Sequence, residues 1–222
     1  MASGSGRTRR KAVIFDLDGV LATTDEQHYR AWKAIADREG IAFDRRSNEA
    51  FRGVSRMACV EILVRDAART YGPAEKEELA RAKNELYRSL LEGLGPEAVL
   101  PGVAGLLARL RAEGILLAVG SSSRNAKLIL ERTGLAGSFD AVADGEDISR
   151  SKPDPEVFLA AARKLGVEPG DCAVVEDAEA GIDAALAAGM LAVGVGPASR
   201  YAKSQLRLEG LDGLEDLSLL LG

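Results

Sequence analysis

The amino-acid sequence predicts a doubly wound, Rossmann-like α/β core built on a parallel sheet, with a helical cap domain inserted into it. The first observation is an apolar run at residues 12–15, which is typical of a strand buried on both faces. The second is the stretch 24–94, which has helical periodicity and no convincing strand. The third is the alternation of strand and helix patterns after residue 95, which indicates right-handed crossovers between parallel strands.

These patterns divide the chain into segments. We expect residues 1–10 to form a disordered basic tail, because the run GRTRRK is not followed by the apolar segment of a targeting signal. Residues 11–23 and 95–222 form the predicted core, and residues 24–94 form the predicted cap.

The individual elements follow from periodicity and from glycine and proline breaks. In the cap, helical patterns occupy residues 25–40, 48–70 and 74–95. In the core, the later strands are expected at 115–123, 139–145, 172–177 and, as the final strand, 191–196. The helices between them are expected at 103–114, 124–134, 155–166 and 178–190. Trp32 lies in the first cap helix, and we expect it in the core of the cap rather than as a platform for a sugar ring.

The bulk composition excludes several classes of protein. The chain has 222 residues, 46% of them hydrophobic and 28% charged, which is ordinary for a globular protein. A net charge of −5 argues against a general nucleic-acid binder, and no apolar run is long enough to span a membrane. Cys59 and Cys172 lack metal-ligand spacing and are expected as buried thiols in a reducing cytoplasm. No exposed apolar helix stripe demands a partner, so we expect a cytoplasmic monomer.

Polar side chains follow several strands of the predicted sheet at the point where each strand ends. They are Asp16 and Asp18, then Ser121, Ser122 and Ser123, then Glu176 and Asp177, with Lys152 just before a helix. Ligands of doubly wound sheets bind beyond the carboxyl ends of the strands, so these groups are expected to converge. Asp177 or Ser123 alone can be explained as a helix N-cap, but the whole set is more simply explained as a site.

The residue types at this edge indicate phosphoryl transfer. Paired carboxylates repel each other, and an oxygen-only donor set suits a hard cation such as Mg²⁺ bridging Asp16 and the Glu176/Asp177 pair. Lys152 and Ser121 can hold phosphoryl oxygens, although the chain has no GxxxxGK phosphate loop. Asp16 is then a candidate nucleophile and Asp18 a candidate proton carrier. The alternative for Asp18 is a turn-stabilising role beside Gly19.

Four motifs in order, "DLDGV", the strand-end Ser121, "SKPDP" and "VVEDAEAGI", resemble those of the haloacid dehalogenase superfamily of phosphotransferases. The resemblance implies that Asp16 is the nucleophile and Asp18 the general acid/base. It also implies that Mg²⁺ is held by Asp16, the backbone carbonyl of Asp18, Glu176 and Asp177.

The segments "TTDEQHYRAWKAIA", "FRGVSR", "ARAKNELY" and "SSSRN" further resemble the sugar-phosphomutase branch of that superfamily. That branch interconverts β-glucose 1-phosphate and glucose 6-phosphate through β-glucose 1,6-bisphosphate. The implied substrate- and phosphate-binding residues are Gly53, Val54, Ser55, Arg56, Lys83, Asn84, Ser121, Ser122, Ser123, Arg124, Asn125 and Lys152. Arg56 is expected to hold the phosphate that is not being transferred. Arg52 and Arg124 stand where the branch has lysine, which keeps the charge and changes the geometry.

Two residues at the base of the cap have more than one interpretation. Thr24 can N-cap the first cap helix or act as a hinge between core and cap. His28 is either an ordinary residue of an amphipathic helix or, as the resemblance implies, a link between Asp18 and cap closure.

Two other functions stay open at this stage. A sugar-phosphate phosphatase fits the core motifs equally, and only "FRGVSR" and "AKNELY" in the cap favour the mutase. A non-enzymatic regulator with a degraded hydrolase fold is disfavoured by the intact set of acidic, serine and lysine side chains.

Overall fold

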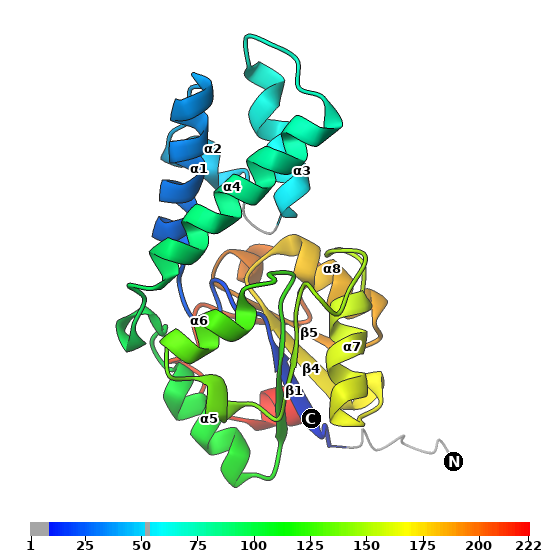
Figure 1. Ribbon diagram of the computed structural model, residues 1–222. Helices are drawn as coiled ribbons and strands as arrows, with labels where there is room; N and C mark the ends of the chain where they lie inside the picture. Colours follow the sequence, from blue (N-terminus) through cyan, green and yellow to red (C-terminus); the bar gives the residue numbers. More distant parts are fainter. Residues whose placement is uncertain (1–8, 52–53) are drawn as a thin grey trace, which may run out of the picture.

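The computed structural model describes residues 9–51 and 54–222 (Figure 1). Within these residues it contains a six-stranded sheet in the order β3-β2-β1-β4-β5-β6, and every neighbouring pair is parallel. The strands are β1 (Ala12–Phe15), β2 (Leu116–Gly120), β3 (Ala141–Ala143), β4 (Cys172–Glu176), β5 (Leu191–Val195) and β6 (Leu206–Leu208). The strand order reverses direction at β1, as in other doubly wound sheets, so the predicted fold class is confirmed.

The sheet is covered by helices on both faces because successive side chains of each buried strand point to opposite sides. On β1, Val13 and Phe15 pack in one apolar cluster, and Ala12 and Ile14 pack in another. The helices on the first face are α5 (Val103–Ala112) and α6 (Ala126–Arg132), with the C-terminal α9 (Ser218–Leu221). Those on the second face are α7 (Glu156–Leu165) and α8 (Glu179–Ala187). Packing of helices on both faces holds the strands in register, and with them the polar residues at their carboxyl ends.

The segment between β1 and α5 is helical. Its helices are α1 (Asp25–Glu39), α2 (Arg45–Glu49), α3 (Arg56–Leu63) and α4 (Pro73–Leu91). They stand together beyond one end of the sheet (Figure 1) and have an apolar cluster of their own. Trp32 is 2% exposed within that cluster, which confirms its predicted place in the core of the cap.

Two connections join these helices to the sheet, and they run side by side. The backbone N–H of Thr23 donates to the carbonyl of Ala98 at 2.9 Å, and the N–H of Leu100 donates to the carbonyl of Leu21 at 3.0 Å. These bonds lie next to the boundaries that the sequence places at residues 23/24 and 94/95. The two connections therefore form a short, hydrogen-bonded double link between the helical part and the sheet.

The structure corrects three details of the sequence interpretation. Strand β6 follows the segment expected to be the last strand; it is only three residues long, with a central arginine, too short to give a periodic signal. The expected helix at 48–70 is interrupted after α2 and resumes at α3. Arg9 and Arg10 do not behave as a free tail: Arg9 pairs with Glu113, and the N–H of Arg10 donates to the carbonyl of Leu221. The first eight residues lie outside the described part of the chain.

The expectations about cysteines and membranes can also be compared with the structure. Cys59 and Cys172 are free and buried, as expected. Among the described residues, no helix combines the length and the apolar character needed to cross a membrane.

Candidate active site

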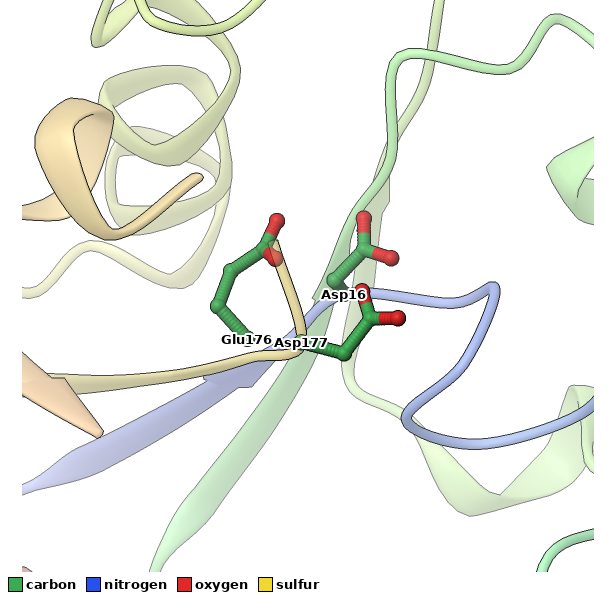
Figure 2. Close-up of side chains that lie close together, drawn as sticks. All are labelled: Asp16, Glu176 and Asp177. Atoms are coloured by element: carbon green, nitrogen blue, oxygen red, sulfur yellow. The ribbon is translucent and has the colours of Figure 1, made fainter. Parts of the chain in front are cut away.

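Three carboxylates meet at the carboxyl edge of the sheet. Asp16 directly follows β1, while Glu176 ends the neighbouring β4 and Asp177 follows it. One oxygen from each of the three lies within 4.8 Å of the others, and Figure 2 shows the three side chains directed toward a common space. The pairing of β1 with β4 dictates this meeting, because parallel neighbours end at the same edge.

Two glycines allow this close approach. Gly19 has φ of +81°, and a Cβ there would lie 2.1 Å from the Asp177 carboxylate. A Cβ on Gly181, in the first half of α8, would lie 2.0 Å from the Glu176 side chain. Both positions therefore need a residue without a side chain.

Lys152 supplies the positive charge inside this acidic cluster. Its ammonium donates to Asp16 Oδ1 and to Glu176 Oε1, and all three side chains are buried. Burial alone would lower the pKa of Lys152, but the two carboxylates raise it above its usual value. Burial raises the pKa of Asp16 well above its usual range, and Glu176 and Asp177 raise it further, while Lys152 opposes the shift. Three carboxylates thus share the single ammonium group of Lys152.

This donor set fits a hard divalent cation. Three carboxylates offer only oxygen atoms, which Mg²⁺ prefers, and their oxygens are near enough to share one ion. Burial and neighbouring negative charge raise the pKa of Asp16. A bound cation would oppose both effects, because its charge stabilises the ionised carboxylate.

Asp18 lies beside this cluster and is tied to the base of the cap. It accepts a hydrogen bond from Thr24 Oγ1, and Thr24 in turn accepts one from the hydroxyl of Tyr87 at 2.9 Å. Burial raises the pKa of Asp18, which suits a carboxyl group that must give and take a proton. Thr24 occupies the N-cap position of α1, as the sequence predicts, but its side chain makes no capping hydrogen bond because its hydroxyl donates to Asp18 instead.

In the cap, the buried Lys83 contacts the half-buried His28. Lys83 Nζ lies 2.8 Å from His28 Nδ1, and it sits 4.2 Å above the ring of Tyr87. Burial lowers the pKa of His28 well below its usual value, and the charges of Lys83 and Arg56 lower it further. The imidazole is therefore neutral and can accept a hydrogen bond from the ammonium.

Lys83 is a buried lysine without a carboxylate in hydrogen-bond contact among the described residues. It is 2% exposed, and burial, followed by the charge of Arg56, lowers its pKa to about 7. Its ammonium nitrogen contacts a ring nitrogen of His28 rather than a carboxylate. An ammonium held without a carboxylate partner costs stability and is typical of a functional position.

Replacing Lys83 with methionine should therefore stabilise the protein, by roughly 0.5–2 kcal/mol at pH 7. The pKa of Lys83 is lower in the folded state than in the unfolded chain, so the unfolded chain holds this proton more tightly between pH 7 and 10.5. As the pH rises from 7 to 10.5, the free energy of unfolding of the wild type should increase relative to that of Lys83→Met. The stability advantage of the variant should therefore become smaller. Urea unfolding at several pH values measures this; a less stable variant at pH 7 would contradict it.

The loop after β2 carries the expected serines, arginine and asparagine. Ser121 is 3% exposed, its Oγ accepts a hydrogen bond from the backbone N–H of Ser123 at 3.2 Å, and Ser123 Oγ accepts one from the N–H of Asn125 at 3.2 Å. The buried hydroxyl of Ser122 has no hydrogen-bond partner among the described residues. A ring of hydroxyls and N–H groups at a strand end is suited to an anion.

Two arginines from opposite sides of the site lie near each other. Arg56 begins α3 in the cap, Arg124 follows β2 in the core, and burial together with the charge of Arg124 lowers the pKa of Arg56. Arg56 is half-buried and Arg124 is exposed. Two guanidiniums whose charges repel each other across the site are suited to hold a phosphate between them.

The remaining predicted cap residues differ in exposure and in the contacts they make. Val54 is 36% exposed beside α3, and Ser55 caps that helix by accepting a hydrogen bond from the N–H of Ala58 at 3.4 Å. Asn84 accepts a hydrogen bond from Asn125 at 3.0 Å. Gly53 and Arg52 lie outside the described residues.

Sequence reasoning missed two neighbours of these groups. Tyr87 and Arg88 each lie four residues after a predicted site residue, Lys83 and Asn84, and therefore on the same face of α4. That spacing in "KNELYR" was the available signal.

The fold and the site agree with the comparisons to known proteins. Residues 10–189 match the family model of haloacid dehalogenase-like hydrolases, and the chain belongs to that family. It is similar to the β-phosphoglucomutase of Bacillus subtilis, with 50% identity over 188 residues that cover 84% of this chain and 83% of the relative. It is also similar to the fructose-1-phosphate phosphatase of Escherichia coli, with 34% identity, covering 84% of this chain and 97% of that one. The crystal structure of a β-phosphoglucomutase from Clostridium difficile matches with a TM-score of 0.88 and 35% identity over 95% of each chain.

Proposed function

We propose that this chain is a Mg²⁺-dependent β-phosphoglucomutase. It interconverts β-D-glucose 1-phosphate and D-glucose 6-phosphate through an aspartyl-phosphate enzyme and β-glucose 1,6-bisphosphate. The observation that carries the proposal is the 50% identity to a β-phosphoglucomutase over 84% of the chain. The identity to a fructose-1-phosphate phosphatase over the same share of the chain is lower, at 34%.

Asp16 is the group that receives and gives the phosphoryl group. An oxygen of its carboxylate attacks phosphorus in line with the leaving sugar oxygen, and an acyl phosphate forms. Lys152, which donates to Asp16, neutralises charge on the phosphoryl oxygens, together with the hydroxyl of Ser121. In the reverse direction, a sugar hydroxyl attacks phosphorus and frees the carboxylate.

Asp18 moves the proton of the sugar hydroxyl. As the base, it removes that proton when the hydroxyl attacks phospho-Asp16, and it returns the proton when the sugar oxygen leaves. Thr24 donates a hydrogen bond to one oxygen of Asp18, which holds the side chain in one orientation.

The metal site is proposed at Asp16, Glu176, Asp177 and the backbone carbonyl of Asp18. When bound there, Mg²⁺ shields the negative charge that the acids and the phosphoryl group would otherwise concentrate. In the cap and the loop after β2, Arg56, Arg124 and Asn125 would hold the second phosphate. We propose 24–94 as the cap domain that supplies these contacts and closes over the sugar.

Exclusion of water distinguishes a mutase from a phosphatase on this scaffold. Water competes with the sugar for phospho-Asp16 at far higher concentration, so the site must be closed when Asp18 is aligned. Thr24, which directly precedes α1, donates to Asp18, and Tyr87 of α4 donates to Thr24, so the alignment of Asp18 depends on the position of the cap. The cytoplasmic location and the monomeric state stay predictions from the sequence.

A phosphatase acting on a sugar phosphate is the second candidate, favoured by the 34% identity to a fructose-1-phosphate phosphatase. In that case water, rather than a second sugar hydroxyl, would take the phosphoryl group from Asp16.

One assay distinguishes the two functions. The enzyme is supplied with β-glucose 1-phosphate, Mg²⁺ and a trace of β-glucose 1,6-bisphosphate, and glucose 6-phosphate and inorganic phosphate are followed together. We expect glucose 6-phosphate to accumulate with little phosphate release. Phosphate release equal to substrate loss would contradict the mutase, and absence of turnover with a panel of sugar phosphates would contradict both enzymes.

A further inference from the structure

Asn125, at the start of α6 in the core, is held by two residues of the cap. Arg88 Nη1 donates to Asn125 Oδ1 at 3.2 Å, and Asn125 Nδ2 donates to Asn84 Oδ1 at 3.0 Å. Asn84 and Arg88 are four residues apart on α4, so they lie one turn apart on one face of that helix. Figure 1 shows the C-terminal half of α4 approaching α6, the place where this contact forms.

The two bonds match the two ends of the amide. The guanidinium of Arg88 can only donate, and it meets the amide oxygen; the amide nitrogen of Asn125 can only donate, and it meets an oxygen of Asn84. Asn125 is 2% exposed. A buried amide satisfied at both ends has one preferred orientation, so the contact is specific rather than a chance touch of surfaces.

The side chain of Asn125 makes this contact instead of capping its own helix. It occupies the N-cap position of α6, where asparagine normally accepts a hydrogen bond from the helix N–H groups, yet its side chain makes no such bond. Its backbone N–H instead donates to Ser123 Oγ, and the N–H of Ser123 donates to Ser121 Oγ. The side chain that holds the cap is thus linked through one short loop to the strand end that faces Asp16.

We propose that Asn84, Arg88 and Asn125 form a clamp that holds the cap closed on the core, and that Arg88 is a positioning residue for phosphoryl transfer to the sugar. This inference rests on the proposed function for its effect on product ratio. The clamp joins cap and core at Asn125, beside the proposed second-phosphate residue Arg124, while the hydrogen bond from Thr24 to Asp18 is a separate contact near the nucleophile.

The clamp is compatible with substrate binding. The amide of Asn125 keeps a second N–H and a further lone pair for a phosphate or a sugar hydroxyl. The guanidinium of Arg88 is exposed and has no carboxylate partner among the described residues, so its contact with Asn125 is weak enough to open in each turnover. Substrate held by Asn125 and the neighbouring Arg124 would then strengthen closure.

The test compares Arg88→Met with Arg81→Met in the full-length enzyme. Arg81 is an exposed arginine of the same helix whose ion pairs with described residues are to Glu78 and Glu85 on α4, so its removal controls for loss of charge and of helix propensity. The first readout is inorganic phosphate released per glucose 6-phosphate formed. Loss of one charge-assisted hydrogen bond that exists only in the closed state should raise this ratio about three- to tenfold in Arg88→Met. Arg88→Lys, which keeps one donor, should restore most of the wild-type ratio.

The second readout does not depend on activity. Nitroxide labels at Glu49→Cys in the cap and Glu131→Cys in the core, with both native cysteines replaced by alanine, report the distance between the domains by pulsed electron resonance. We expect Arg88→Met, and not Arg81→Met, to broaden the distribution toward longer distances.

The outcomes separate the clamp from the function. A distance distribution in Arg88→Met equal to that in Arg81→Met would overturn the clamp, as would a lower melting temperature with an unchanged product ratio. If Arg88→Met broadens the distance distribution while the wild-type enzyme releases phosphate and forms no glucose 6-phosphate, the clamp is supported and the mutase is contradicted. The pairing is also tested by combining Arg88→Met with Asn125→Ala. If Arg88→Met has no further effect on the product ratio in the Asn125→Ala enzyme, the pairing is supported; additive effects of the two changes would contradict it.

Discussion

Replacing Asp16 with asparagine is expected to abolish phosphoryl transfer, lowering turnover by roughly four orders of magnitude or more. The amide of asparagine is a poor nucleophile and cannot form an acyl phosphate. The fold should survive the change, because Asp16 sits beside Glu176 and Asp177, and removing one of three neighbouring negative charges relieves repulsion. Initial rates of glucose 6-phosphate formation measure the effect, and thermal unfolding shows that the variant is folded.

The control is Asp183→Asn, a change of the same kind on the surface of α8, where the carboxylate contacts Tyr201 and Lys203. It should leave turnover near that of the wild type. Borohydride reduction of the working enzyme followed by peptide mapping should place the acyl phosphate on the peptide containing Asp16. A folded Asp16→Asn enzyme with substantial turnover, or a phosphate on another residue, would remove Asp16 from its proposed role.

Asp18→Asn is expected to lower turnover by about a hundred- to ten-thousandfold, the usual contribution of a general acid/base. The asparagine oxygen can still accept the hydrogen bond that Thr24 now donates to Asp18, so geometry is kept while proton transfer is lost. The backbone carbonyl proposed as a metal ligand is unchanged. We therefore expect the affinity for Mg²⁺, measured by titration calorimetry, to change little.

A comparison with Asp25→Asn, a neighbouring acid at the start of α1, controls for loss of negative charge near the base of the cap. If Asp18→Asn turned over sugar phosphates nearly as fast as the wild type, Asp18 would be a turn residue and not the proton carrier. If its affinity for Mg²⁺ fell as steeply as its turnover, its side chain would belong to the metal site instead.

The core of the site could be predicted from the sequence because it depends on strand ends. Asp16 and Glu176 end neighbouring parallel strands, so knowledge of the sheet order alone brings them together. Lys152 was expected at the phosphoryl oxygens, and the structure adds that it contacts two of the acids directly. Continuous apolar runs identify the buried strands of this sheet, whereas the three residues of β6 are too few to give such a signal.

The contacts between cap and core could not be derived in the same way. Nothing in the periodicity of α4 says that Tyr87 reaches Thr24, or that Arg88 reaches a side chain 37 residues away. These contacts depend on how the helical segment packs across its two connections to the sheet. Thr24 shows the difference: its position in the sequence favours a helix cap, and only the packed structure shows its hydroxyl turned toward Asp18.

The most direct test of the central claim is a crystal structure of the enzyme with Mg²⁺ and beryllium fluoride, which mimics a phosphoryl group on a carboxylate. We predict the beryllium bound to a carboxylate oxygen of Asp16, with Lys152 donating to a fluoride and Mg²⁺ held by Asp16 together with Glu176 and Asp177. A structure in which the metal binds away from these acids, or in which Asp16 carries no beryllium fluoride while another residue does, would contradict the account.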